Sequence, residues 1–193
     1  MSMAQAHTPI PQVASSEHEP QPRAHPSHGA GDRPHGPVRG RLTLRRDITV
    51  GVDIDATPDQ VWAVVAPIED HVQWMRDAVA LRFVGDQTSG IGTRFVVDTK
   101  VGPLRITDEM AVTAWEPGAA MGVEHHGAVS GRGRFTLRPR PGGGTRFTWT
   151  EELHFPWWLG GSAGALAGRR VLAAVWRRNL ETLKALVEAR AAA

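Results

Sequence analysis

The chain has 193 residues, enough for one domain with a hydrophobic core, and it contains no cysteine, which excludes disulfides, thiolate metal sites and cysteine nucleophiles. No stretch approaches the roughly 18 consecutive apolar residues that cross a bilayer, and the start lacks a secretory signal, so a cytoplasmic protein is expected. Six arginines against three acidic residues give residues 1–46 a net charge of +3, so the total of +2 leaves the remainder at −1, a balance that argues against nucleic-acid binding.

The composition of residues 1–46 predicts a disordered tail. Residues 1–40 hold 7 of the 14 prolines and 5 of the 9 histidines, but almost no large apolar side chains. Such a segment cannot bury enough apolar surface to offset the entropy lost on ordering. The histidines are irregularly spaced, which does not favour a metal-binding tract. We therefore expect a tail over 1–46 and one ligand-binding domain over 47–193.

The first elements of this domain are a strand and two short helices. Apolar residues alternate with other residues over Ile48–Ile54, the pattern of a half-buried strand. Thr57–Asp59 predicts the start of a helix, because threonine caps helices well and proline suits the first helical position. Pro67 ends this helix, and a second short helix is expected over Glu69–Met75.

Six further strands and a long helix are predicted after these. The strands alternate apolar and polar residues and are joined by short turns, which indicates an antiparallel, curved sheet. On the longest strand, Leu104–Ala114, every second residue is expected to face inward, including Asp108 and Ala114. The period of the apolar residues over 165–189 predicts an amphipathic helix.

Five segments carry a resemblance to a known family: Ala56–Trp62, Trp115–Gly118, Gly131–Leu137, Gly143–Glu151 and Asn179–Lys184. With the order of elements, they resemble the SRPBCC superfamily, most closely its polyketide cyclase/dehydrase branch. The resemblance implies an α+β helix-grip (START-like) fold. In that fold a curved antiparallel sheet of about seven strands surrounds the long C-terminal helix, with two short helices after the first strand. The superfamily includes cyclases, lipid carriers, hormone receptors and co-chaperones, so the fold alone does not select an activity.

The resemblance also implies a cavity between the sheet and the long helix. Ligand cavities are mostly apolar with a few polar groups. The residues expected to line it are Trp74, Phe95, Val97, Met110, Val123, Phe135, Trp149, Trp176 and Leu180, with the polar residues Asp108, His125, Glu151 and Asn179. The alternative interpretation of the apolar residues is ordinary core, and that of the polar ones is solvent contact near a strand end or bulge.

Two of the polar residues are candidate catalytic groups. A carboxylate among apolar neighbours is costly to keep charged, so Asp108 is a candidate general acid or base. His125 is a second candidate, because imidazole titrates near neutral pH. Glu151 and Asn179 are candidate ligand contacts.

Trp157 and Trp158 are expected either to form the lip of the cavity, where exposed tryptophans also favour transient membrane contact, or to cap the core. We expect no metal and no cofactor. His125 and His126 are adjacent, so on a strand they point to opposite faces, and no other spacing imitates a ligand set.

Three functions are compatible with these patterns. The first is binding or transport of a hydrophobic small molecule, such as a lipid, a quinone or a polyketide-like compound. The second is a polyketide cyclase or dehydratase that uses Asp108 and His125 as acid and base. The third is an interaction domain like that of the co-chaperones. Whether the protein is an enzyme stays open at this stage, and so does its oligomeric state.

Overall fold

The computed structural model describes residues 47–127, 129–154 and 161–193, and the side chains of all of these except 161–167. The tail predicted over 1–46 lies outside the described residues, so its disorder stays a prediction. The elements are β1 (Asp47–Ile54), α1 (Pro58–Val65), the 3₁₀ helix η1 (Ile68–Gln73), β2 (Ala78–Phe83), β3 (Arg94–Val101), β4 (Leu104–Glu116), β5 (Ala120–Gly127), β6 (Ser130–Pro139), β7 (Thr145–His154) and α2 (Gly161–Ala191).

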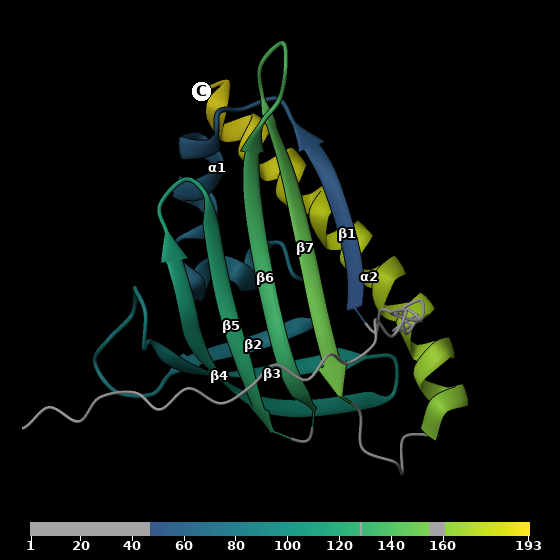
Figure 1. Ribbon diagram of the computed structural model, residues 1–193. Helices are drawn as coiled ribbons and strands as arrows, with labels where there is room; N and C mark the ends of the chain where they lie inside the picture. The colour runs from purple at the N-terminus through teal and green to yellow at the C-terminus, as the bar shows by residue number, and fades with distance from the viewer. Residues whose placement is uncertain (1–46, 128, 155–160) are drawn as a thin grey trace, which may run out of the picture. The chain divides into compact units, whose positions relative to one another are not determined.

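The seven strands form one antiparallel sheet in the order β1-β7-β6-β5-β4-β3-β2. The sheet is strongly curved, so that β2 and β3 run across the ends of β6 and β7, while α2 passes behind β7 and β1 (Figure 1). A strand, two short helices, six strands and a long helix is the predicted order, and the architecture is the predicted helix-grip fold. The bounds of two helices differ from the prediction: η1 spans Ile68–Gln73 instead of 69–75, and α2 spans Gly161–Ala191 instead of 165–189.

The start of α1 follows the predicted chemistry. The backbone N–H of Gln60 donates to the Thr57 hydroxyl at 3.3 Å, and the backbone N–H of Thr57 donates to the Gln60 side chain at 2.9 Å. This reciprocal pair satisfies donors that the first turn of a helix leaves unpaired, and Pro58 occupies the first helical position.

One prediction on β4 is wrong because the strand contains a bulge. The register shifts between Val112 and Ala114, after which Trp115 pairs with the inward-facing Met121. The extra residue moves Ala114 to the outer face and turns Trp115 inward. There the Trp115 ring meets Trp62 of α1 edge-on, with centroids 5.2 Å apart.

Side chains of α2 form hydrogen bonds with backbone groups along the outer edge of β1. Arg169 donates to the carbonyl of Asp47 at 2.7 Å, and Lys184 donates to the carbonyl of Asp53 at 2.8 Å. The backbone N–H of Asp55 donates to Glu188 at 2.8 Å. Unpaired backbone groups on an edge strand can pair with a strand of another chain. These bonds occupy such groups and also fix α2 against the sheet.

Candidate functional site

A cavity of about 360 Å³ lies between the sheet and α2. Most of its wall is apolar and comes from alternate residues of β3 to β7 and from the first half of α2. Ten of the predicted site residues line it: Phe95, Val97, Asp108, Met110, Val123, His125, Phe135, Trp149, Glu151 and Trp176.

The aromatic part of the wall is tightly packed. Trp149 of β7 and Trp176 of α2 stack with centroids 4.9 Å apart and planes 23° apart, and Phe135 meets Trp149 edge-on at 5.3 Å. These contacts hold α2 against the sheet while leaving aromatic surface toward the cavity.

Three of the residues expected in the wall are not among the described residues that line the cavity. Trp74 is fully buried in the part of the core that does not border the cavity, which we call the closed core. From there it packs against the wall residues Phe135 and Trp149. Leu180 lies one helical turn beyond Trp176, also in the closed core. Trp157 and Trp158 lie outside the described residues, so the lip and the membrane contact predicted for them stay predictions.

The third residue, Asn179, joins α2 to the segment that follows η1. Its side-chain oxygen accepts from the backbone N–H of Arg76 at 3.1 Å, and its amide donates to the Asp77 carboxylate at 2.6 Å. Because these two bonds engage both ends of the fully buried amide, Asn179 has a structural explanation that requires no ligand.

A polar cluster interrupts the apolar wall at the middle of the sheet. His125 of β5 bonds through Nε2 to Glu151 of β7 at 3.2 Å, and the side chains of the two residues are 10% and 6% exposed. The indole N–H of Trp149 donates to the other oxygen of Glu151 at 2.8 Å. Glu151 is thus the hub of the cluster, which the sequence does not indicate because β5 and β7 are separated by β6.

Glycines on the neighbouring strands make room for two of the buried carboxylates. Gly133 pairs across the sheet with Glu151, and Gly127 pairs with Asp108. A Cβ at either glycine would overlap the facing carboxylate oxygen. Each carboxylate therefore lies directly over a glycine of the neighbouring strand, and a side chain in place of that glycine would displace the carboxylate. A glycine opposite a buried acid is a signal that sequence inspection can use once the register is known.

His71 of η1 also lines the cavity and is missed by the sequence analysis, because it lies in a short helix without a clear apolar stripe. Its Nε2–H donates to the carbonyl of Val65 at 2.7 Å. Burial lowers the pKa of the imidazole to about 4, against smaller opposing effects of the Val65 bond and the nearby Asp70. His71 is therefore a neutral group of the wall at physiological pH.

The cavity opens between the turn that joins β3 to β4 and the first half of α2. Leu104 and Val171 both line the cavity, yet they are 37% and 52% exposed. Apolar side chains that belong both to the wall and to the surface mark an entrance for an apolar molecule.

Within the described ranges, no group of three or more His, Asp or Glu side chains is placed to hold a metal ion. None of the helices described here is long and apolar enough to cross a membrane.

Fold and cavity together define a helix-grip protein with a small-molecule-sized interior. Residues 45–188 match the family model described as polyketide cyclase/dehydrase and lipid transport. The chain belongs to this family, in agreement with the resemblance seen in its sequence. No curated protein matches the sequence significantly.

Several solved structures share the fold. A protein from Thermus thermophilus superposes with a TM-score of 0.63 at 17% identity, over 75% of this chain and 98% of that one. The Zhui aromatase/cyclase from Streptomyces sp. R1128 gives 0.60 at 17% identity, over 75% and 94%. The di-domain ARO/CYC StfQ from the steffimycin biosynthetic pathway gives 0.63 at 17% identity, over 76% and 52%. At these identities the likeness establishes the fold.

Proposed function

We propose that this protein binds an apolar, polyketide-like small molecule in the cavity between the sheet and α2. The observation that carries the proposal is an apolar cavity of about 360 Å³ with a buried polar cluster in its wall. This volume is near the lower end of the ~300–1,000 Å³ range of ligand pockets, which favours a molecule of a few rings over a lipid with two acyl chains. The family description and the aromatase/cyclase neighbours support the same ligand class.

In this proposal the two parts of the wall have different roles. Phe135, Trp149 and Trp176 offer aromatic surface to the rings of the ligand. The cluster around Glu151 and His125 bonds to a polar substituent and sets the orientation of the ligand. Burial of apolar surface then supplies most of the affinity, and the polar groups supply selectivity.

Native mass spectrometry of the purified protein, followed by denaturing extraction, tests this proposal. We expect a bound apolar compound in the native spectrum, and the extracted mass identifies it as a polyketide-like molecule, a quinone or a lipid. A protein that is empty and whose melting temperature does not rise with polyphenols, quinones or lipids would contradict the proposal. Such a result would favour a domain that binds a partner protein.

A second candidate function is a cyclase or dehydratase, and the bond between His125 and Glu151 favours it specifically. With Nε2–H donated to Glu151, the neutral ring carries a lone pair on Nδ1 that can take a proton. Removal of a proton from a carbon between two carbonyls is the first step of an aldol ring closure. Glu151 would act as a positioning residue that stabilises the imidazolium, and Asp108 is the second acid/base candidate in the wall.

Deuterium exchange of benzoylacetone, an apolar 1,3-diketone, tests this second candidate. We expect the protein to accelerate exchange of the central C–H in D₂O, because His125 would take the proton and solvent would return a deuteron. His125→Ala should abolish the acceleration. His126→Ala is a matched control, because His126 is exposed on the opposite face of the same strand. Exchange at the wild-type rate in His125→Ala would remove His125 from the mechanism.

A further inference from the structure

The charges that face the cavity are predominantly negative. Three carboxylates belong to its wall, those of Asp77, Asp108 and Glu151. Asp77 accepts a bond from Asn179 at 2.6 Å, and Glu151 accepts bonds from His125 and Trp149 at 3.2 and 2.8 Å. These partners of Asp77 and Glu151 are neutral donors, apart from His125 when it is protonated.

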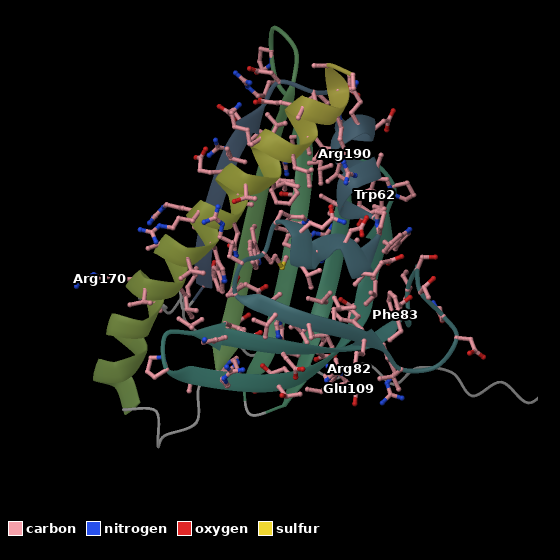
Figure 2. All side chains as sticks on the ribbon, turned by 180° about the vertical axis from the view of Figure 1, so that it is seen from behind. Trp62, Arg82, Phe83, Glu109, Arg170 and Arg190 are labelled. Carbon is pink, nitrogen blue, oxygen red and sulfur yellow. The ribbon has the colours of Figure 1, made fainter. Side chains whose placement is uncertain are left out.

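Arginines of the surrounding strands form ion pairs with acidic residues that do not line the cavity. Arg134 is the one arginine or lysine among the described wall residues, and its guanidinium pairs with Glu116 at 2.8 Å with 45% of the side chain exposed. Arg82 pairs with Asp98 at 2.8 Å, and Arg94 pairs with Glu109. In Figure 2 the labelled Arg82 and Glu109 lie on the outer side of the sheet, away from α2.

The two histidines of the wall do not reverse this sign. His71 is kept neutral by burial, which lowers its pKa to about 4. The described wall thus holds three carboxyl groups against one guanidinium, that of Arg134, which is paired with Glu116, and the imidazole of His125. An incoming carboxylate therefore meets mainly carboxyl groups in this wall.

We infer that the cavity discriminates against carboxylates and other anions and accepts neutral or cationic apolar molecules that donate hydrogen bonds, such as phenols, enols and amines. This inference rests on the proposed function and specifies its ligand class. An ionised carboxylate side chain can accept but not donate, so it favours a ligand hydroxyl or ammonium over a ligand carboxylate. An anion would lose its hydration and would face the carboxyl groups of Asp77, Asp108 and Glu151 in place of water. Free fatty acids are accordingly poor ligands of this cavity.

Displacement of the neutral dye Nile red by three matched naphthalenes at pH 7 tests the inference. We expect 2-naphthol and 2-(aminomethyl)naphthalene to bind at least about tenfold more tightly than 2-naphthoate, which has the same ring system with a carboxylate. Affinity of 2-naphthoate within about twofold of that of 2-naphthol would overturn the inference while leaving the proposed function intact. If none of the three displaces the dye or raises the melting temperature, the proposed function fails, and the inference fails with it.

Variants connect the selectivity to the carboxylates. Glu151→Gln and Asp108→Asn each remove one negative charge from the wall, and each should bring the affinity of 2-naphthoate closer to that of 2-naphthol. Glu109→Gln is the matched control, because it removes a negative charge from the outer face of β4 and should leave the ratio unchanged. A ratio that is the same in all three variants and the wild type would show that the wall charges do not set the selectivity. Asp77→Asn gives an additional measurement if one of the other variants does not fold.

Discussion

The two halves of α2 face different environments. Between Gly168 and Trp176 the helix borders the cavity, and Val171 is 52% exposed at the entrance. Leu183 and Val187, further along the same helix, are at most 1% exposed in the core, where this half lies beside α1 (Figure 1). Asn179 lies at the boundary and ties the helix to Asp77. One helix thus stabilises the fold with its second half and contributes to the ligand site with its first.

The sheet has the same division. Toward one end of β6 and β7, Leu137 and Phe147 fill the closed core, whereas toward the other end Gly133 and Glu151 line the cavity. This division separates stability from binding, because substitutions in the closed core cost packing while substitutions in the cavity wall act where packing is already incomplete.

The largest expected effect is on stability in the closed core. Leu183→Ala should lower the free energy of unfolding by about 2–5 kcal/mol, because it opens a void among fully buried side chains. Leu172→Ala is the matched change in the half that borders the cavity, and it should cost about 1 kcal/mol, because Leu172 is only partly buried. Denaturant unfolding of both variants measures the contrast. Equal losses would mean that the two halves of α2 are packed alike.

The buried imidazole of His71 makes stability depend on pH. Its pKa is about 4 in the folded protein against 6.5 when unfolded, so the unfolded chain takes up the proton first as the pH falls. The contribution is therefore fully present above pH 6.5 and is lost as the pH falls toward 4, by about 3 kcal/mol. His71→Gln keeps a donor for the Val65 carbonyl but does not titrate. Urea unfolding at pH 6.5 and 4 should show the wild type losing about 3 kcal/mol more than this variant, and equal losses would contradict the assignment.

The junction between the two halves is expected to have an intermediate effect. Asn179→Ala leaves the buried N–H of Arg76 and the Asp77 carboxylate without this partner, and should cost about 1–3 kcal/mol of stability. Arg178→Ala, at the exposed neighbouring position, should change stability by less than about 0.5 kcal/mol. If the two variants melt at the same temperature, Asn179 does not fix α2 to the rest of the domain.

The smallest predicted effect is a gain in stability. Gly168 is a helical glycine where an added Cβ would meet no described atom within 4 Å. Gly168→Ala should raise stability by about 0.5–1 kcal/mol, because alanine loses less backbone entropy in a helix. A decrease measured by thermal unfolding would mean that this half of α2 is more tightly packed than its position at the cavity indicates.

Much of the sheet could be predicted because alternation of apolar and polar residues determines which side chains face inward. This pattern places residues such as Phe95, Val97 and Val123 on the inner face, and short turns between consecutive strands determine the antiparallel order. The resemblance to a family with a hollow interior supplied the cavity itself, which no local pattern contains.

The remaining differences have local physical causes. The helical period identifies the apolar stripe of α2 but not the point at which that stripe passes from the cavity to the core, so it does not show that Leu180 lies beyond the described cavity wall. A bulge adds one residue without a clear signature, so the alternation predicts Ala114 on the inner face, where the structure has Trp115. His71 and Asp77 lie in a short 3₁₀ helix and the loop after it, where no period marks the inner face.

Calorimetric titration of 2-naphthol into the wild type and two tryptophan variants of α2 tests the central claim most directly. Leu172→Trp places a large ring in the cavity, whereas Ala174→Trp places the same ring at an exposed position on the same helix. We predict that the wild type and Ala174→Trp bind 2-naphthol with the same affinity and that Leu172→Trp binds at least about tenfold more weakly. Unchanged affinity in a folded Leu172→Trp variant would contradict the assignment of this cavity as the ligand site.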